Sequence, residues 1–186
     1  MKKLLIFSFA IICAFSVVSC NMSGANPQKI FDKIGLNGNK MPRSFDRHFK
    51  EIRAQMTNNS LTIVTKDNEV KKGVTATEYI ETMYINMFEA DIQGIKDLAS
   101  DAESQPIIDA GLAMFQYADE IYKNDFPRIA KMIDDGVSDE EIDAAIGELD
   151  NTKGVELDNK YAKTMDLLLP YADKNGVKYK VMNTPF

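Results

Sequence analysis

Apolar residues recur at helical spacing through most of the chain from Thr75 to Ala172, and this periodicity constrains the fold more than any other feature. Two capping boxes, Thr75 with Glu78 and Ser138 with Glu141, each mark the start of a helix. The segments between successive helical patterns are short, which favours antiparallel neighbours. The spacing predicts helices over residues 75–100, 104–133, 138–149 and 157–172.

The N-terminal part of the chain adds two shorter helices. Asn26, followed by a proline, is a helix start, and the helix is expected to end before Gly35. The segment Gly35–Pro42 is rich in turn residues and is predicted to be a loop. Ser44 is placed to cap a second helix, which continues to Met56.

Two prolines and two strand-like segments complete the predicted architecture. Pro127 and Pro170 lie inside helical patterns, and each predicts a bend or a break because proline removes a backbone hydrogen bond. Residues 61–65 are β-prone, and residues 177–182 are either a strand or an extended arm over the helices. We therefore expect a mostly α protein, an antiparallel bundle of about four to six helices with short strands near 61–65 and 177–182.

The first twenty residues have the organisation of a secretory signal. Lys2 and Lys3 precede Leu4–Val18, a run of fifteen residues with nothing more polar than serine or cysteine. A membrane-spanning helix needs about 20 apolar residues, so this run is short for a permanent anchor. Its length is that of the apolar region of a cleaved signal peptide.

The sequence Val17-Val18-Ser19-Cys20 resembles the lipobox of bacterial lipoproteins. The resemblance implies cleavage before Cys20 and acylation of that cysteine, so that residues 1–19 are a lipoprotein signal peptide. Two or three acyl chains make membrane attachment effectively permanent. Residues 20–26 are then a lipidated tether and residues 27–186 a single helical domain. Asn21 stands where an inner-membrane retention signal has aspartate, which favours attachment to the outer membrane, facing the periplasm.

Charge is distributed unevenly along the chain. The formal net charge is −6, yet residues 75–151 contain nineteen acidic and only four basic side chains. The basic stretch before them, around Arg47 and Arg53, either contacts anionic headgroups or packs beside the acidic helices and neutralises them. This balance argues against nucleic-acid binding, which needs a basic surface. The densest acidic cluster, a candidate surface for a protein partner, comprises Asp134, Asp135, Asp139, Glu140, Glu141 and Asp143.

Other residues offer weaker signals for chemistry. Met83 and Met87 are spaced one helical turn apart and are weak candidates for copper(I), although methionines commonly fill helical cores. Acids at the edges of the apolar stripes, such as Asp91, are either functional carboxylates or partners of lysine and tyrosine. Stripe tyrosines, such as Tyr161, either line a ligand groove or pack in the core. The only histidine, His48, is expected on a polar face.

These signals predict a lipid-anchored envelope protein that acts as a non-enzymatic binding module, with an immunity-like protein as one specific form. No nucleophile motif and no phosphate-binding glycine loop is present, and no cofactor is expected. The alternative is a helical bundle that binds a metal or a small ligand. A hydrolase using paired carboxylates is the third hypothesis.

The lipobox gives the first testable prediction. Substituting Cys20→Ala removes the thiol to which the lipid is attached, so incorporation of radiolabelled palmitate and partition into the membrane fraction should both be lost. Cys13→Ala is the matched control, because Cys13 lies in the signal peptide and should leave labelling intact. Labelling retained in the Cys20 variant would contradict the assignment.

Overall fold

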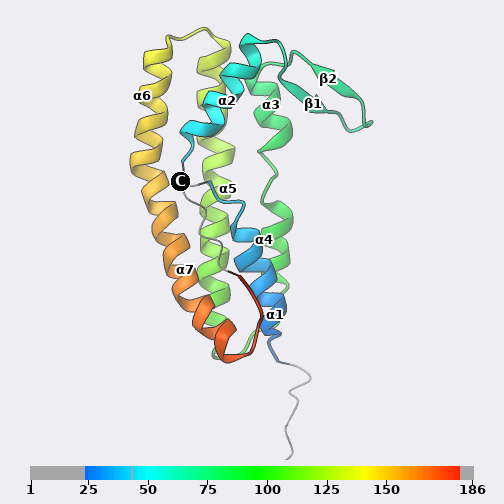
Figure 1. Ribbon diagram of the computed structural model, residues 1–186, viewed down its shortest axis with the longest axis vertical. Coiled ribbons are helices and arrows are strands. Elements are labelled where there is room, and N and C mark those ends of the chain that lie inside the picture. The colour runs from blue at the N-terminus through cyan, green and yellow to red at the C-terminus, as the bar shows by residue number, and fades with distance from the viewer. Residues whose placement is uncertain (1–23, 43, 181–186) are drawn as a thin grey trace, which may run out of the picture.

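The longest helix, α5 (Gln105–Asp134), forms the centre of the bundle in the computed structural model, which describes residues 24–42 and 44–180 (Figure 1). The chain then turns and runs back antiparallel as α6 (Asp139–Leu149), the π-helical segment η2 (Asp150–Gly154) and α7 (Val155–Lys174). The helices predicted over residues 138–149 and 157–172 are present as α6 and α7, but no loop separates them. The π-helical turn keeps the backbone helical through Gly154, so the two helices join.

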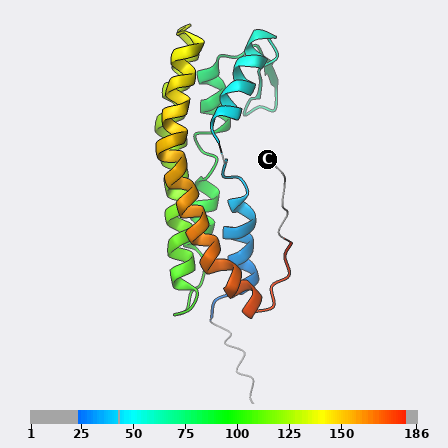
Figure 2. The ribbon, with the colours of Figure 1, turned by 60° about the vertical axis from the view of Figure 1, so that its left-hand side comes forward.

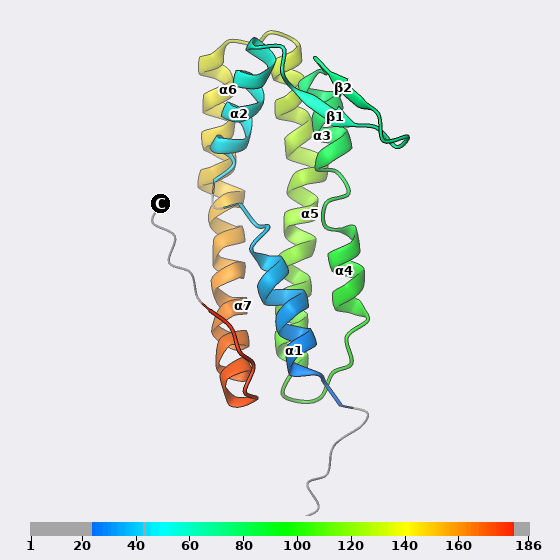
Figure 3. The same cartoon turned by 45° about the vertical axis from the view of Figure 1, so that its right-hand side comes forward.

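The remaining elements cover α5 from the other side (Figures 1 and 3). The chain enters through α1 (Pro27–Ile30) and the π-helical segment η1 (Phe31–Leu36), and α2 (Asp46–Thr57) follows after a loop. A hairpin of β1 (Thr62–Val64) and β2 (Val70–Lys72) comes next. Helices α3 (Ala76–Met83) and α4 (Glu89–Lys96) then pack along α5. The mostly helical bundle with a short sheet agrees with the sequence-based expectation.

The predicted helix over residues 75–100 is interrupted. Residues 84–88 form turns between α3 and α4, so the expectation of one continuous helix was wrong. The rings of Tyr84 and Phe88, at the two ends of this segment, both contact Tyr122 of α5, with ring centroids 5.5 and 5.2 Å away. Packing of these rings overrides the local helical pattern, because tertiary contacts routinely outweigh helix propensity.

Neither internal proline breaks its helix. Pro127 lies within α5 and Pro170 within α7, and both helices continue past them, which corrects the expected break. A proline inside a helix costs about 3 kcal/mol through the lost hydrogen bond and the steric clash with the preceding turn. In α5, Phe126 and Ile129 on either side of the proline are fully buried, and their burial offsets this cost.

The first helix does not end before Gly35, as the sequence had suggested. It continues through Leu36, and Gly35 is buried against α7. A Cβ atom at this position would lie 3.0 Å from Cδ2 of Leu168, so glycine lets η1 approach α7 closely. Here the glycine serves helix packing and does not terminate the helix.

The strand predicted for residues 61–65 is confirmed by the β1–β2 hairpin, in which Val64 pairs with Val70. The segment near residues 177–182 has no strand over residues 177–180, and residues 181 and 182 lie outside the described residues. Tyr179 instead packs on Phe31, with ring centroids 4.8 Å apart, and its hydroxyl donates to Asp173. Residues 177–180 therefore form an extended arm, the other form that the sequence allowed.

Three predicted helix caps are present. The Oγ atoms of Thr75 and Ser138 accept hydrogen bonds from the backbone of Glu78 and Glu141, and Asn26 caps α1. The signal peptide and Cys20 lie outside the described residues. Within the described ranges, the structure contains no helix with the length and apolar character needed to cross a membrane.

The start of α2 depends on a residue that is distant in the sequence. Asp150 in η2 accepts a hydrogen bond from the backbone N–H of Phe45 at 2.7 Å and from the hydroxyl of Ser44 at 2.9 Å. The predicted cap, Ser44, accepts from the N–H of Asp46 at 3.2 Å. Two side chains therefore satisfy the free N–H groups of this helix start, and one of them fixes α2 to the helix across the bundle.

The distant cap gives a stability prediction. Substituting Asp150→Ala should lower the free energy of unfolding by about 1–2 kcal/mol, because the N–H of Phe45 and the hydroxyl of Ser44 lose their acceptor. Chemical denaturation measures the loss. Glu148→Ala is the matched control, since Glu148 is exposed on the preceding turn and should change stability by less than about 0.5 kcal/mol. Equal stability of the two variants would contradict the capping role.

Candidate functional site

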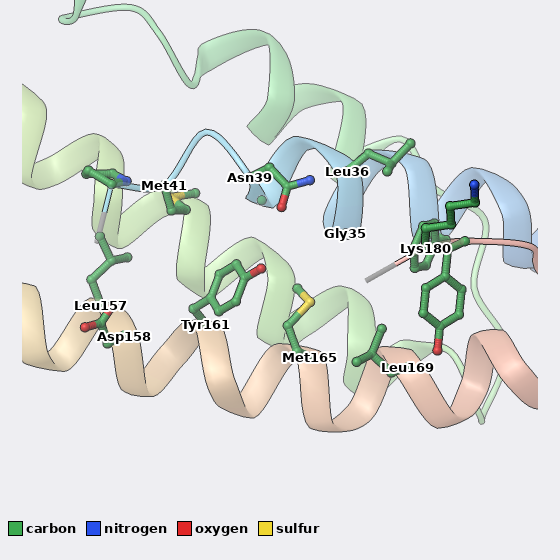
Figure 4. A pocket seen from close by; sticks show the side chains of 14 residues that line it. Gly35, Leu36, Asn39, Met41, Leu157, Asp158, Tyr161, Met165, Leu169 and Lys180 are labelled. Atoms are coloured by element: carbon green, nitrogen blue, oxygen red, sulfur yellow. The ribbon is translucent and has the colours of Figure 1, made fainter. Parts of the chain in front are cut away.

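A groove of about 720 Å³ lies between η1 with its following loop and α7, and the C-terminal arm closes one end (Figure 4). Its volume falls in the range of small-molecule sites in proteins. The groove is lined by Phe31, Gly35, Leu36, Gly38, Asn39, Met41, Pro42, Leu157, Asp158, Tyr161, Met165, Leu169, Tyr179 and Lys180.

One wall of the groove is a single row of side chains on α7. Leu157, Tyr161, Met165 and Leu169 follow one another at intervals of four residues, so they occupy the same face of the helix. The apolar stripe predicted for this helix is therefore shared between two environments: Leu168 faces the core, and the side chains in this row line the groove. The expectation that Tyr161 lines a groove agrees with this position.

The opposite wall is held in place by a buried carboxylate. Asp91 of α4, whose side chain is only 7% exposed, binds the ammonium group of Lys40 at 2.7 Å and the amide of Asn37 at 2.8 Å. A buried charge needs such partners to offset the loss of hydration. Because Lys40 and Asn37 flank Gly38 and Asn39, this contact fixes the loop that forms the groove wall.

The other stripe-edge acids bind lysines in the same way. Asp125 pairs with Lys153 at 2.7 Å, and Asp119 pairs with Lys123 at 3.0 Å. The interpretation of these acids as partners of lysine is thus confirmed, and no two of them form a carboxylate pair at the groove. One oxygen of Asp119 is buried and makes no hydrogen bond within the described part of the chain.

Three polar groups at the groove have unused hydrogen-bonding capacity. The amide of Asn39, the hydroxyl of Tyr161 and the ammonium group of Lys180 form no hydrogen bond or ion pair with any described residue. They come from the loop, from α7 and from the arm. Apolar walls with a few polar groups that are available to a ligand are typical of binding sites.

The acidic cluster predicted as a partner surface lies where α5 turns into α6, at the end of the bundle opposite the start of α1 (Figures 1 and 2). Asp134 caps α3: its two carboxylate oxygens accept the backbone N–H groups of Ala76 and Thr77, each at 2.8 Å. Asp135 pairs with Lys131 one helical turn earlier, at 2.8 Å. These two acids stabilise the fold.

Arg53 of α2 binds two further acids of the cluster, Asp139 at 2.9 Å and Asp143. The arginine side chain is mostly buried, so the acidic turn neutralises this charge. Packing of the basic helix beside the acidic helices, one of its two expected roles, is therefore observed at Arg53. Glu140 is exposed and its side chain forms no hydrogen bond or ion pair with another described residue.

The two candidate metal-binding methionines do not lie on successive turns of one helix. Met83 is the last residue of α3 and is partly exposed, whereas Met87 lies in the turn segment that follows. The break at residues 84–88 thus removes the spacing on which the copper hypothesis depended. Within residues 24–42 and 44–180, no three or more histidine, cysteine, aspartate or glutamate side chains are grouped to hold a metal ion.

His48 lies against an aromatic cluster, and the expected polar face was wrong. Its Nδ1 is 3.1 Å from the hydroxyl of Tyr84, and the two rings meet edge to face. Burial lowers the pKa of His48, and Arg47 acts in the same direction, while Glu51 and Asp150 raise it. Burial also raises the pKa of Tyr84 to about 12. The helical pattern placed His48 on the side opposite the apolar stripe, and only the fold shows that the α3–α4 segment covers it.

No protein family model, no curated protein and no solved structure matches this chain.

The position of His48 predicts a pH dependence of stability. Its pKa in the folded protein lies below its value of about 6.5 in the unfolded chain, so the unfolded chain binds more protons as the pH falls through this value. The stabilisation from the neutral ring is present above about pH 6.5 and is lost below it. In urea unfolding between about pH 7.5 and 5.5, His48→Gln should lose less stability than the wild type. Identical pH profiles would contradict this.

Proposed function

We propose that the protein is a non-enzymatic binding module of the bacterial envelope, anchored by lipid at Cys20 and binding its ligand in the groove between η1 and α7. The observation that carries the proposal is the composition of the groove, in which an apolar wall lies beside three polar groups that form no hydrogen bond or ion pair with any described residue. A binding role requires only a ligand whose apolar and polar groups match those of the groove.

The arrangement of the chain is compatible with such an anchor. Pro27, the first residue of α1, follows Cys20 by seven residues, a reach of at most about 25 Å for an extended chain. The bundle would therefore stay close to the outer membrane, on its periplasmic side, as the lipobox resemblance implies. The long helix α5 spans about 45 Å and would carry the acidic turn away from that surface.

The groove is a stronger candidate contact than the acidic cluster. Asp134, Asp139 and Asp143 each bind another element of the bundle, so folding alone accounts for their charge. A protein partner at that cluster, including an immunity-like role, stays a prediction of the sequence. A hydrolase with paired carboxylates stays a prediction of the sequence; among the described residues that line the groove, Asp158 is the one acid.

A pair of matched variants tests the groove. Leu36 lines it and is 52% exposed, whereas Val155 is 51% exposed and lies outside it. Leu36→Ser should weaken binding of the fluorescent apolar anion anilinonaphthalene sulfonate about five- to tenfold, because roughly half of a leucine side chain no longer contacts the ligand. Val155→Ser should leave the affinity unchanged. Both variants should keep wild-type stability within about 0.5 kcal/mol.

Two results of this fluorescence titration would contradict the proposal. One is equal affinity of Leu36→Ser and wild type, which would place the dye elsewhere. The other is an equal loss in both variants, which would mean that exposed apolar side chains in general attract the dye.

A further inference from the structure

The polar groups of the groove differ in what they can bind. The amide of Asn39 and the hydroxyl of Tyr161 each donate and accept hydrogen bonds, whereas the ammonium group of Lys180 only donates and carries a positive charge. Gly38, next to Asn39, lies against the ring of Tyr161, and Figure 4 draws Lys180 toward the other end of the α7 row, past Met165. The groove therefore has a carboxylate at Asp158, a neutral polar part at Asn39 and Tyr161, and an ammonium group at Lys180.

The part of the α7 row from Tyr161 to Leu169 has the length of a short extended peptide. Tyr161 and Leu169 are eight residues apart on α7, which corresponds to about 12 Å along the helix axis. An extended chain covers this distance with three to four residues at about 3.3 Å each. The apolar side chains of Met165 and Leu169 line the wall between the two ends (Figure 4).

Building on the proposed function, we propose that the groove binds the C-terminal segment of a peptide with apolar side chains. A peptide group pairs with Asn39 and Tyr161, since it offers the donor and the acceptor that these side chains require. The terminal carboxylate lies at Lys180, which has no acidic partner among the described residues. The apolar side chains of the peptide contact Leu36, Met165 and Leu169.

A simple hydrocarbon ligand suits the site less well. An acyl chain would cover Asn39 and Tyr161 without pairing with them, and each polar group buried without a partner costs about 1–3 kcal/mol. A peptide avoids this cost and uses the same apolar wall. The polar groups thus favour a peptide over the acyl chain of a fatty acid.

The test uses the full lipidated chain in nanodiscs, dialysed against a pool of N-acetylated tetrapeptides with only apolar side chains. The pool contains each peptide as a free acid and as a C-terminal amide, and decanoate is dialysed in a parallel cell. Bound ligand is quantified by mass spectrometry, and the amount bound to empty nanodiscs is subtracted. Free acids should be retained about two- to fivefold over amides, the range expected for an exposed charge pair. Asn39→Ala should weaken the retention of both forms.

Lys180→Ala should bring the ratio of acid to amide to about one without changing the retention of amides. Lys178→Ala is the matched control, because Lys178 is exposed on the same arm but does not line the groove. Equal retention of acids and amides by the wild type, or retention of neither, overturns the inference. Decanoate retained in place of peptides, and lost in Leu36→Ser, overturns the inference but keeps the proposed function. If peptides or decanoate are retained equally by Leu36→Ser and by the wild type, both the inference and the proposed function are overturned.

Discussion

The packing of aromatic rings around Tyr122 and Phe126 of α5 is the contact on which the rest of the bundle depends. Phe126 contacts Phe45 and Phe49 from α2 and its N-terminal flank, at centroid distances of 5.5 and 4.9 Å. Tyr122 stacks on Phe88 from the other side. Edge-to-face and offset pairs of this kind are each worth about 0.5–1.5 kcal/mol beyond the burial of their surface. One face of the central helix α5 thereby joins α2 to the α3–α4 segment.

Helix caps that come from other elements complement this core. The chain contains no cysteine after Cys20, so the described bundle has no disulfide to hold its elements together. Instead, Asp134 binds the start of α3 and Asp150 binds the start of α2, each through two or more donors. An acid at a helix N-terminus satisfies free N–H groups and interacts favourably with the helix dipole. Part of the strong negative charge of residues 75–151 is thus explained by helix packing.

Helix boundaries were predictable from the sequence where local signals alone determine them. They were predicted wrongly where a contact with a residue distant in the sequence determines them. Thr75 and Ser138 cap their helices as expected, because a capping box involves residues only three positions apart. Gly35 does not end its helix, since its role depends on Leu168, more than a hundred residues away. For the candidate site, the row at 157, 161 and 165 was recognised as an apolar stripe. The wall facing it is set by Asp91, and no pattern in the sequence links Asp91 to Lys40.

The close packing of η1 also explains why a groove exists beside it. Gly35 against Leu168 and Gly111 against Ile34 let η1 lie close to both α7 and α5, at contacts where a side chain on either glycine would clash. Beyond Leu36 the chain passes Tyr161 and Met165 at Gly38 and continues to the start of α2 near Asp150, so Tyr161, Met165 and Leu169 stay half-buried while Leu157 is buried. On its other side the loop is held by the buried carboxylate of Asp91, which binds Lys40 and Asn37. The walls are therefore fixed by contacts that a ligand does not make, so a ligand need not spend binding free energy on ordering them.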